Sequence, residues 1–341
     1  MIWLAWRQFR WQALTAAVAT VLAAAWLLYL GGDIRDAHSA ALSSCRTRPG
    51  CPQAMADFQA RYRETMLYIA AGLGLGLALL GTFWGGPLVA RELEAGTHRL
   101  VWNQSVTRRH WLATRLLLTV LAAAVVAAIV SALVTWAASP VDKSGGNRFG
   151  TILFGSRDIA PIGYAVFAVT LGTVIGLLVR RTLPAIAITL AAFIAIQFLV
   201  PNLVRPHLMP AKTATMPMTT EAVNHARNLG SVTGGPVIGG ITLPDEPDAW
   251  ISATSPLLTS DDRPLSTARF NHCLSSPPKT GTRGTFGDTA ACLGKLNLHL
   301  KITYQPATRY WTFQLLETAF YLLLSALLAT FALWRIRRHL N

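Results

Sequence analysis

Charged residues are scarce in this sequence. Aspartate, glutamate, lysine and arginine make up 13% of its 341 residues, against about a quarter in soluble domains. Apolar residues make up 52% of the chain. This composition argues against an ordinary soluble domain and is typical of a protein that crosses a membrane several times.

Familiar catalytic and nucleotide-binding motifs are also missing. The sequence has no G-x-S-x-G, no H-E-x-x-H and no G-x-x-x-x-G-K-[ST] run. The signatures of a serine hydrolase, a zinc protease and a P-loop ATPase are therefore absent. We expect no catalytic residue, no metal and no cofactor in this chain, and if the protein is a pump, a separate subunit must hydrolyse ATP.

Negative charge is scarcer than positive charge. The chain has 16 acidic and 30 basic residues, a formal net charge of +14. Such an excess can indicate nucleic-acid binding, but no helix-turn-helix, zinc-finger or RNA-binding signature accompanies it. The arginines lie at the ends of apolar runs, which instead indicates membrane topology.

Six apolar runs are each close to the ~20 residues that a helix needs to cross a bilayer. The first is longer than the ~7–15 residues of a signal-peptide core, so we expect a retained helix. The sequence predicts an all-α membrane protein with spans at 13–31, 65–90, 116–138, 162–179, 183–204 and 310–334. An amphipathic interfacial helix is expected at 1–12, loops at 32–64, 91–115, 139–161, 180–182 and 205–309, and a tail at 335–341.

Two independent features predict the topology. The N-terminal segment, the 91–115 loop, the Arg180-Arg181 turn and the tail are short and rich in arginine, which places them and both termini in the cytoplasm. All four cysteines then fall on the opposite side, where an oxidising compartment favours disulfides. Proximity pairs Cys45 with Cys51 and Cys273 with Cys292, although four cysteines allow three connectivities.

Zinc binding is an alternative for the second cysteine pair. His272 and His299 lie near Cys273 and Cys292 in the sequence, but the close paired spacing of a structural zinc site is missing. We therefore favour the disulfide.

Span two contains two glycine pairs at a spacing of four, Gly72 with Gly76 and Gly81 with Gly85. Such pairs permit close approach of another helix. Glycine is also common in membrane helices, so both interpretations stay open.

Ionisable residues are missing from the interiors of spans one to five, and Glu317 in span six is the exception. Transport driven by ions or protons usually requires such groups inside the membrane, so secondary transport is disfavoured. Gln314 lies one helical turn from Glu317, and both can face the bundle interior as a gate or cargo site. The alternative is a carboxylate at the wet outer boundary that bonds to a neighbouring loop.

The 91–115 segment is polar and basic between two apolar spans. Ser105 or Thr107 can cap a helix that begins near Arg108. The segment is either an ordinary cytoplasmic loop or a docking element for a soluble partner.

Two motifs carry a family resemblance. Residues 94–97 read EAGT and residues 106–109 read VTRR, and the stretch from Tyr304 to Glu317 reads YQPATRYWTFQLLE. Together they resemble the permeases of type-2 ABC exporters, and in particular a bacterial subgroup. Ser105 stands where that family usually has proline, and Thr114-Arg115 replaces its Gly-Lys pair.

The resemblance implies the type-2 ABC exporter permease fold in a bacterial plasma membrane. It implies two permease chains, expected as a homodimer, and two cytoplasmic ATPase subunits that bind ATP and Mg. It also implies a coupling helix within residues 92–104. The residues expected to couple to the ATPase are Glu92, Glu94, Gly96, Thr97, Arg99, Gln104 and Arg108.

The uncharged, aromatic-bearing spans favour a hydrophobic or amphipathic cargo such as a lipid, a peptide antibiotic or a drug. The 205–309 loop would act as an extracellular lid. The alternative from a different class is a membrane sensor or scaffold whose outer, disulfide-containing loop binds a ligand.

Overall fold

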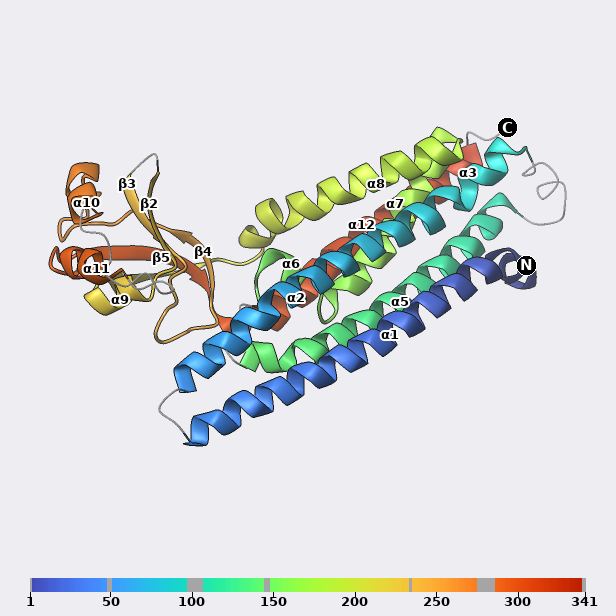
Figure 1. Cartoon of the computed structure of the whole chain (residues 1–341). Coiled ribbons are helices and arrows are strands. Elements are labelled where there is room, and N and C mark those ends of the chain that lie inside the picture. The colour runs from blue at the N-terminus through green and yellow to red at the C-terminus, as the bar shows by residue number, and fades with distance from the viewer. Residues whose placement is uncertain are drawn as a thin grey trace. The chain divides into compact units, whose positions relative to one another are not determined.

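The computed structural model describes residues 2–47, 51–96, 107–143, 148–232, 235–274 and 286–338, and within these ranges all side chains except those of residues 2–6, 8, 9, 46, 47, 51–53 and 56. The chain divides into two compact units. Met1–Leu208 and Trp311–Asn341 form one, called here the helical unit, and Met209–Tyr310 form the other, called the inserted unit. Figure 1 shows the elements of both.

The helical unit consists of long helices interrupted by short turns. Its elements are α1 (Ile2–Thr47), α2 (Cys51–Leu80), the π-helical turn η1 (Gly81–Gly85), α3 (Gly86–Glu94), α5 (Arg108–Lys143), α6 (Thr151–Phe154), α7 (Ala160–Val179), α8 (Thr182–Leu199), the π-helical turn η2 (Val200–Val204), the 3-10 turn η3 (Arg205–His207) and α12 (Tyr310–Arg338).

Six segments among the described residues are long and apolar enough to cross a membrane: Arg10–Cys45, Asp57–Glu94, Arg108–Lys143, Ala160–Val179, Thr182–His207 and Ala307–Arg338. Each contains one of the six predicted spans. In lipid a helix satisfies its own backbone hydrogen bonds, so apolar sequence alone is enough to specify these elements.

Several helices continue where the sequence predicts loops or a separate segment. Residues 2–12 begin α1 and are not an independent helix, and α1 and α2 occupy most of the predicted 32–64 loop. The extension has a tertiary cause: the Tyr62 hydroxyl donates to Asp33 (2.7 Å) and the Arg35 guanidinium lies 3.6 Å from the Trp136 ring centroid. These contacts join α1 to α2 and to α5 beyond the apolar runs.

The predicted 139–161 loop also contains helix. α5 continues to Lys143 and α6 follows within the loop. The buried Arg157 side chain pairs with Asp142 near the end of α5. This ion pair holds the residues around Arg157 against α5.

α7 lies at the centre of the helical unit. Nearly all its residues are buried, with small residues where its neighbours approach. A Cβ at Gly172 or Gly176 would meet the backbone of Gly86, and a Cβ at Gly163 would meet Thr318 of α12 at 3.3 Å. Glycine at these positions therefore permits α3 and α12 to pack directly on the α7 backbone.

The two glycine pairs of span two differ in environment. Cβ atoms at Gly81 and Gly85 would meet Ala168 and Val169 of α7, whereas Gly72 and Gly76 face open space. Close helix approach is therefore the correct interpretation of the second pair. For the first pair, no atom of another described helix lies within 4 Å of an added Cβ.

The inserted unit contains strands, so the all-α prediction is wrong for it. Its elements are β1 (Lys212–Pro217), α9 (Thr220–Asn224), β2 (Asn228–Val232), β3 (Gly235–Gly239), β4 (Trp250–Thr254), α10 (Thr267–Leu274), α11 (Gly287–Gly294), β5 (His299–Gln305) and the 3-10 turn η4 (Ala307–Arg309). β5 pairs antiparallel with β1 and β4, and β2 pairs antiparallel with β3.

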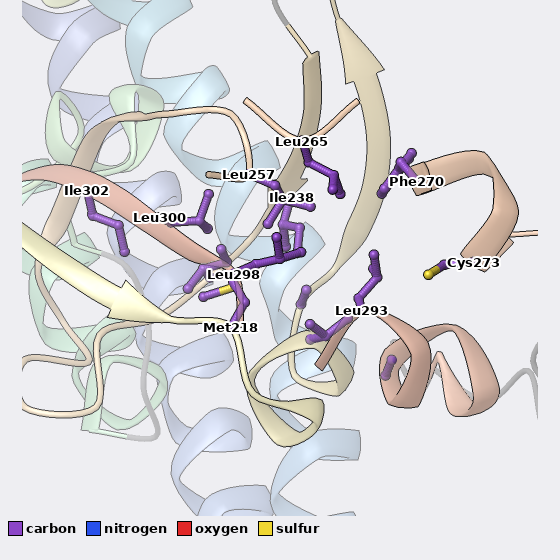
Figure 2. Close-up of a cluster of buried hydrophobic side chains, with 14 of the residues drawn as sticks. Met218, Ile238, Leu257, Leu265, Phe270, Cys273, Leu293, Leu298, Leu300 and Ile302 are labelled. Atoms are coloured by element: carbon purple, nitrogen blue, oxygen red, sulfur yellow. The ribbon is translucent and has the colours of Figure 1, made fainter. Parts of the chain in front are cut away.

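A hydrophobic core holds the inserted unit together. Leu300 and Ile302 of β5 are fully buried and pack with Ile238 of β3, Phe270 of α10 and Leu293 of α11 (Figure 2). The alternation of buried and exposed side chains along β5 is the pattern of a strand with one face on a core.

Candidate functional site

The segment before residue 97 is the last part of a continuous helical run that changes its winding at η1. The run passes from α2 through the π-helical turn Gly81–Gly85 into α3. π-helical turns inside α-helices are frequent at functional sites. Here the turn is packed against α7 at Gly85, so α3 leaves the turn at a fixed position.

Gly96 ends the helical run. α3 stops at Glu94, Ala95 is its C-cap, and Gly96 has a left-handed φ of +70°. Glycine adopts this conformation without the steric cost that a Cβ imposes. The predicted Gly96 therefore has a structural role at the C-terminal end of α3.

Glu92 contacts the next span. Its carboxylate lies 2.6 Å from the Arg115 guanidinium of α5, and both side chains are largely buried. Arg115 also donates to the Leu88 carbonyl (3.3 Å) and lies 4.7 Å from the Trp111 ring centroid. This pair joins the end of α3 to the start of α5.

Glu94 contacts a different helix, α8. Its carboxylate accepts a hydrogen bond from the Thr182 backbone N–H at 2.8 Å. Thr182 is the first residue of α8, and the first four N–H groups of a helix have no partner within the helix. Glu94, which is exposed, thus supplies an acceptor to the first turn of α8 from 88 residues away in the sequence.

An apolar cluster lies beside these polar contacts. Val89 of α3 packs with Trp111 and Leu112 of α5, with Val174 and Leu177 of α7, and with Ala332 and Ile336 of α12. The polar residues at the end of α3 therefore lie beside an apolar cluster to which α3, α5, α7 and α12 all contribute.

Three of the remaining predicted coupling residues lie outside the described residues, namely Thr97, Arg99 and Gln104. Arg108 is the first residue of α5. The predicted Thr107 cap is confirmed, because its hydroxyl accepts from the His110 N–H at 3.3 Å.

A second cluster surrounds Glu317 on α12. Arg205 of η3 donates to its carboxylate through Nε (2.6 Å) and Nη2 (3.0 Å), and Tyr164 of α7 donates through its hydroxyl (2.5 Å). Arg205 and Glu317 are fully buried. The carboxylate is therefore not at a wet boundary, although it does bond to Arg205, the first residue of the predicted 205–309 loop. The Arg205 charge neutralises Glu317 within the helical unit.

Gln314 also faces this interior. Its side-chain oxygen accepts from the Ala160 N–H at the start of α7 (2.9 Å), and its nitrogen donates to the Phe154 carbonyl of α6 (3.1 Å). The Arg205 guanidinium lies 4.1 Å from the Phe154 ring centroid. Gln314 and Glu317 thus lie in one polar network that joins α6, α7, η3 and α12.

Arg205 is the residue of this network that sequence reasoning missed. It follows directly on the predicted end of span five and is 112 residues from its partner. The available signal was the single arginine after an apolar run, together with a carboxylate in span six. A buried carboxylate requires a cationic or hydrogen-bonding partner.

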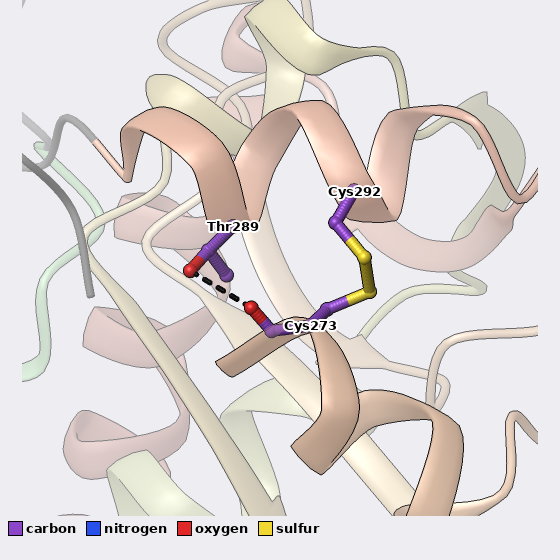
Figure 3. Close-up of a disulfide and its surroundings, with 3 residues drawn as sticks. All are labelled: Cys273, Thr289 and Cys292. Atoms are coloured by element: carbon purple, nitrogen blue, oxygen red, sulfur yellow. Dashed lines mark hydrogen bonds between the residues drawn. A yellow bond between two sulfur atoms is a disulfide. The ribbon is translucent and has the colours of Figure 1, made fainter. Parts of the chain in front are cut away.

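The inserted unit contains the predicted Cys273–Cys292 disulfide, with a Cα–Cα distance of 5.5 Å. It joins α10 to α11, and the Thr289 hydroxyl donates to the Cys273 carbonyl (Figure 3). Zinc binding by these two cysteines is therefore excluded. Cys45 is also disulfide-bonded, whereas the side chain of Cys51, its predicted partner, lies outside the described side chains.

Asp262 of the inserted unit forms an exposed ion cluster. Its carboxylate lies 2.9 Å from the Lys301 ammonium and 2.8 Å from His299 Nε2. Hydrogen bonds from Lys301 and His299 hold the pKa of the Asp262 carboxyl below its usual range. Within the described part of the chain, no group of three or more His, Cys, Asp or Glu side chains could hold a metal ion.

Comparison with known protein families gives a match over the first part of the chain. Residues 17–205 match the model of a family described as ABC-2 membrane transporter related. The match covers more than half of the chain, from the first span to Arg205. No protein with a curated description and no solved structure matches the chain.

Proposed function

The chain belongs to the ABC-2 membrane transporter related family, and from this membership we propose that it is the permease subunit of an ATP-driven exporter. The family consists of transporter membrane subunits and implies association with an ABC ATPase. The observation that carries the proposal is the match over residues 17–205, which includes the whole segment between spans two and three. Fold alone does not define a function, so the proposal rests on this family membership and needs a direct test.

The proposed topology places both termini and the 91–115 segment in the cytoplasm of a bacterium. The positive-inside rule supports it, since the arginine-rich connections at 91–115 and 180–182 then share one side. The helical unit agrees with this grouping, because Glu94 at the end of α3 bonds the α7–α8 connection directly. The inserted unit with its disulfide would be extracellular.

The proposed coupling element is residues 92–104. ATP-driven closure of two ATPase subunits would displace this element, and the spans would move between inward-open and outward-open arrangements. Packed helices shift between discrete positions, so motion of α3 would reach its neighbours. Differential binding of nucleotide to the two arrangements would supply the free energy.

The proposed cargo is hydrophobic or amphipathic. The one predicted intramembrane carboxylate, Glu317, is satisfied by Arg205 and Tyr164, so it does not supply an unpaired charge for a cation or a proton. Large apolar side chains are exposed along the spans, as at Tyr68, Leu183 and Phe198. A second copy of this chain, in a homodimer, would enclose the transport path between two such surfaces.

The experiment that tests the proposal is purification of the tagged chain from its native membrane in a mild detergent, followed by identification of co-purifying proteins. We expect a stoichiometric ABC ATPase that hydrolyses ATP with Mg. Repeated absence of an ATPase, in a detergent that preserves known transporter complexes, would instead favour a sensor whose inserted unit binds a ligand.

A further inference from the structure

Glu94 belongs to the predicted set of ATPase contacts, but its carboxylate is already engaged within the chain. It accepts from the Thr182 N–H, and Thr182 opens α8. Glu92 is likewise engaged, with Arg115 of α5. The two carboxylates therefore lie on one helix end and hold two different spans.

α3 contacts both α7 and α8. α3 packs on the α7 backbone at Gly176, and Gly86 at its start lies against Ile186 of α8 (3.5 Å for an added Cβ). At its other end Glu94 bonds the first residue of α8. α3 is thus fixed to α8 near both of its ends.

The turn between α7 and α8 is short enough to transmit displacement. Arg180 ends α7 in a left-handed conformation with φ of +57°, and α8 begins at Thr182. α8 then continues through η2 into η3, which carries the buried Arg205. Displacement of the start of α8 would therefore act on the span that ends at the Arg205–Glu317 pair.

We infer that Glu94 is a positioning residue that transmits displacement of the end of α3 to α8, and that it does not contact the ATPase itself. This inference rests on the proposed function for its driving partner. The contact to the N-terminal turn of α8 is made by a carboxylate, which is the favourable charge at a helix N-terminus. Glutamine at this position would keep an acceptor oxygen, whereas alanine would remove it.

The first arm of the test needs no ATPase. Amide hydrogen exchange is measured on the full chain in lipid nanodiscs for wild type, Glu94→Ala and Glu94→Gln. Loss of a capping contact of ordinary strength corresponds to about a fivefold faster exchange in the first turn of α8. We expect that increase in Glu94→Ala and little change in Glu94→Gln.

The second arm uses the complex purified with its ATPase. A fluorophore is placed at Leu183→Cys on α8 or at Leu117→Cys on α5, since both leucines are exposed. Its response to a non-hydrolysable ATP analogue is recorded. We expect Glu94→Ala to abolish the response at position 183, to leave that at position 117, and to retain the ATPase. Glu94→Gln restores the response at 183.

A matched control removes a carboxylate elsewhere on the same helical run. Glu64 is exposed on α2, and Glu64→Ala is expected to leave both responses unchanged. The inference is overturned if Glu94→Ala releases the ATPase, which would make Glu94 a direct contact. It is also overturned if the response at 183 persists, or if exchange in α8 is unchanged. Failure of the proposed function looks different, because the wild-type chain would then bring no ATPase and show no nucleotide response.

Discussion

The Arg205–Glu317 pair allows a quantitative prediction about the stability of the helical unit. Both side chains are fully buried, and two hydrogen bonds join them. Replacement of Glu317 by leucine leaves the Arg205 charge buried without its partner. Removing one partner of a buried ion pair lowers folding stability by about 3–5 kcal/mol, since the remaining charge is uncompensated. We therefore expect Glu317→Leu to lower the free energy of unfolding by about that amount.

Removal of both charges is expected to cost less. The double variant Arg205→Met with Glu317→Leu leaves no buried charge, but the Tyr164 hydroxyl loses its acceptor. An unsatisfied buried hydroxyl costs about 1–3 kcal/mol. A triple variant that adds Tyr164→Phe removes this hydroxyl as well, so its stability should return to within about 1 kcal/mol of the wild type.

The assay is equilibrium unfolding in mixed micelles of a mild detergent with increasing sodium dodecyl sulfate, followed by tryptophan fluorescence. The predicted order of stability is wild type near the triple variant, then the double variant, then Glu317→Leu. A neutral Glu317→Leu would contradict this prediction. So would a double variant whose loss of stability equals the sum of the losses in Arg205→Met and Glu317→Leu. Either result would mean that the pair is not buried together in the folded protein.

Three further predictions concern other parts of the chain. Gly176→Ala places a Cβ against the α3 backbone and should destabilise the helical unit by about 1–3 kcal/mol in the same unfolding assay, whereas Gly74→Ala, which meets open space, should not. Replacing Cys273 and Cys292 by serine opens a loop with a sequence separation of 19 and should cost the inserted unit about 3 kcal/mol, measured as faster amide exchange of that unit in the full chain; unchanged exchange would contradict this. Because its pKa is lowered in the folded state, Asp262 should add stability above the ordinary carboxyl pKa and lose it as the pH falls through the folded value. Acid titration of Asp262→Asn should therefore show a weaker loss of stability below about pH 4, and an identical acid limb would argue against the ion cluster.

The number of membrane helices could be predicted from the sequence, but the ends of those helices could not. Hydropathy reports only the part of a helix that meets lipid. α1 continues to Thr47 because Asp33 and Arg35 find partners on α2 and α5. Such partners are distant in sequence and leave no local pattern.

The candidate site was likewise predictable only where it depends on local sequence. The Thr107 cap follows from local backbone rules, and the structure has it where the sequence predicts it. Glu94 bonds Thr182, which is 88 residues away, and Glu317 bonds Arg205, which is 112 residues away. Both contacts depend on how the helices pack. That packing leaves no local pattern in the sequence, so neither the Glu94–Thr182 contact nor the Arg205–Glu317 pair could be predicted.

The inserted unit was the least predictable part. Its strands are short, five to seven residues each. β5 pairs with β1 and β4 across long sequence distances, whereas β2 and β3 follow each other closely in the chain. Proline and glycine within and between them weaken any period in the sequence. The disulfide was predictable because its two cysteines are close in the chain.

The most direct test of the central claim is whether the purified chain binds an ABC ATPase through the segment that follows α3. Gly96→Pro removes the left-handed turn at φ of +70°, which proline cannot adopt. We expect an ATPase to co-purify with the wild-type chain in a fixed ratio, and we expect Gly96→Pro to abolish nucleotide-dependent transport while the chain remains folded in the membrane. A wild-type chain that reproducibly carries no ATPase, or full ATP-dependent transport by Gly96→Pro, would contradict it.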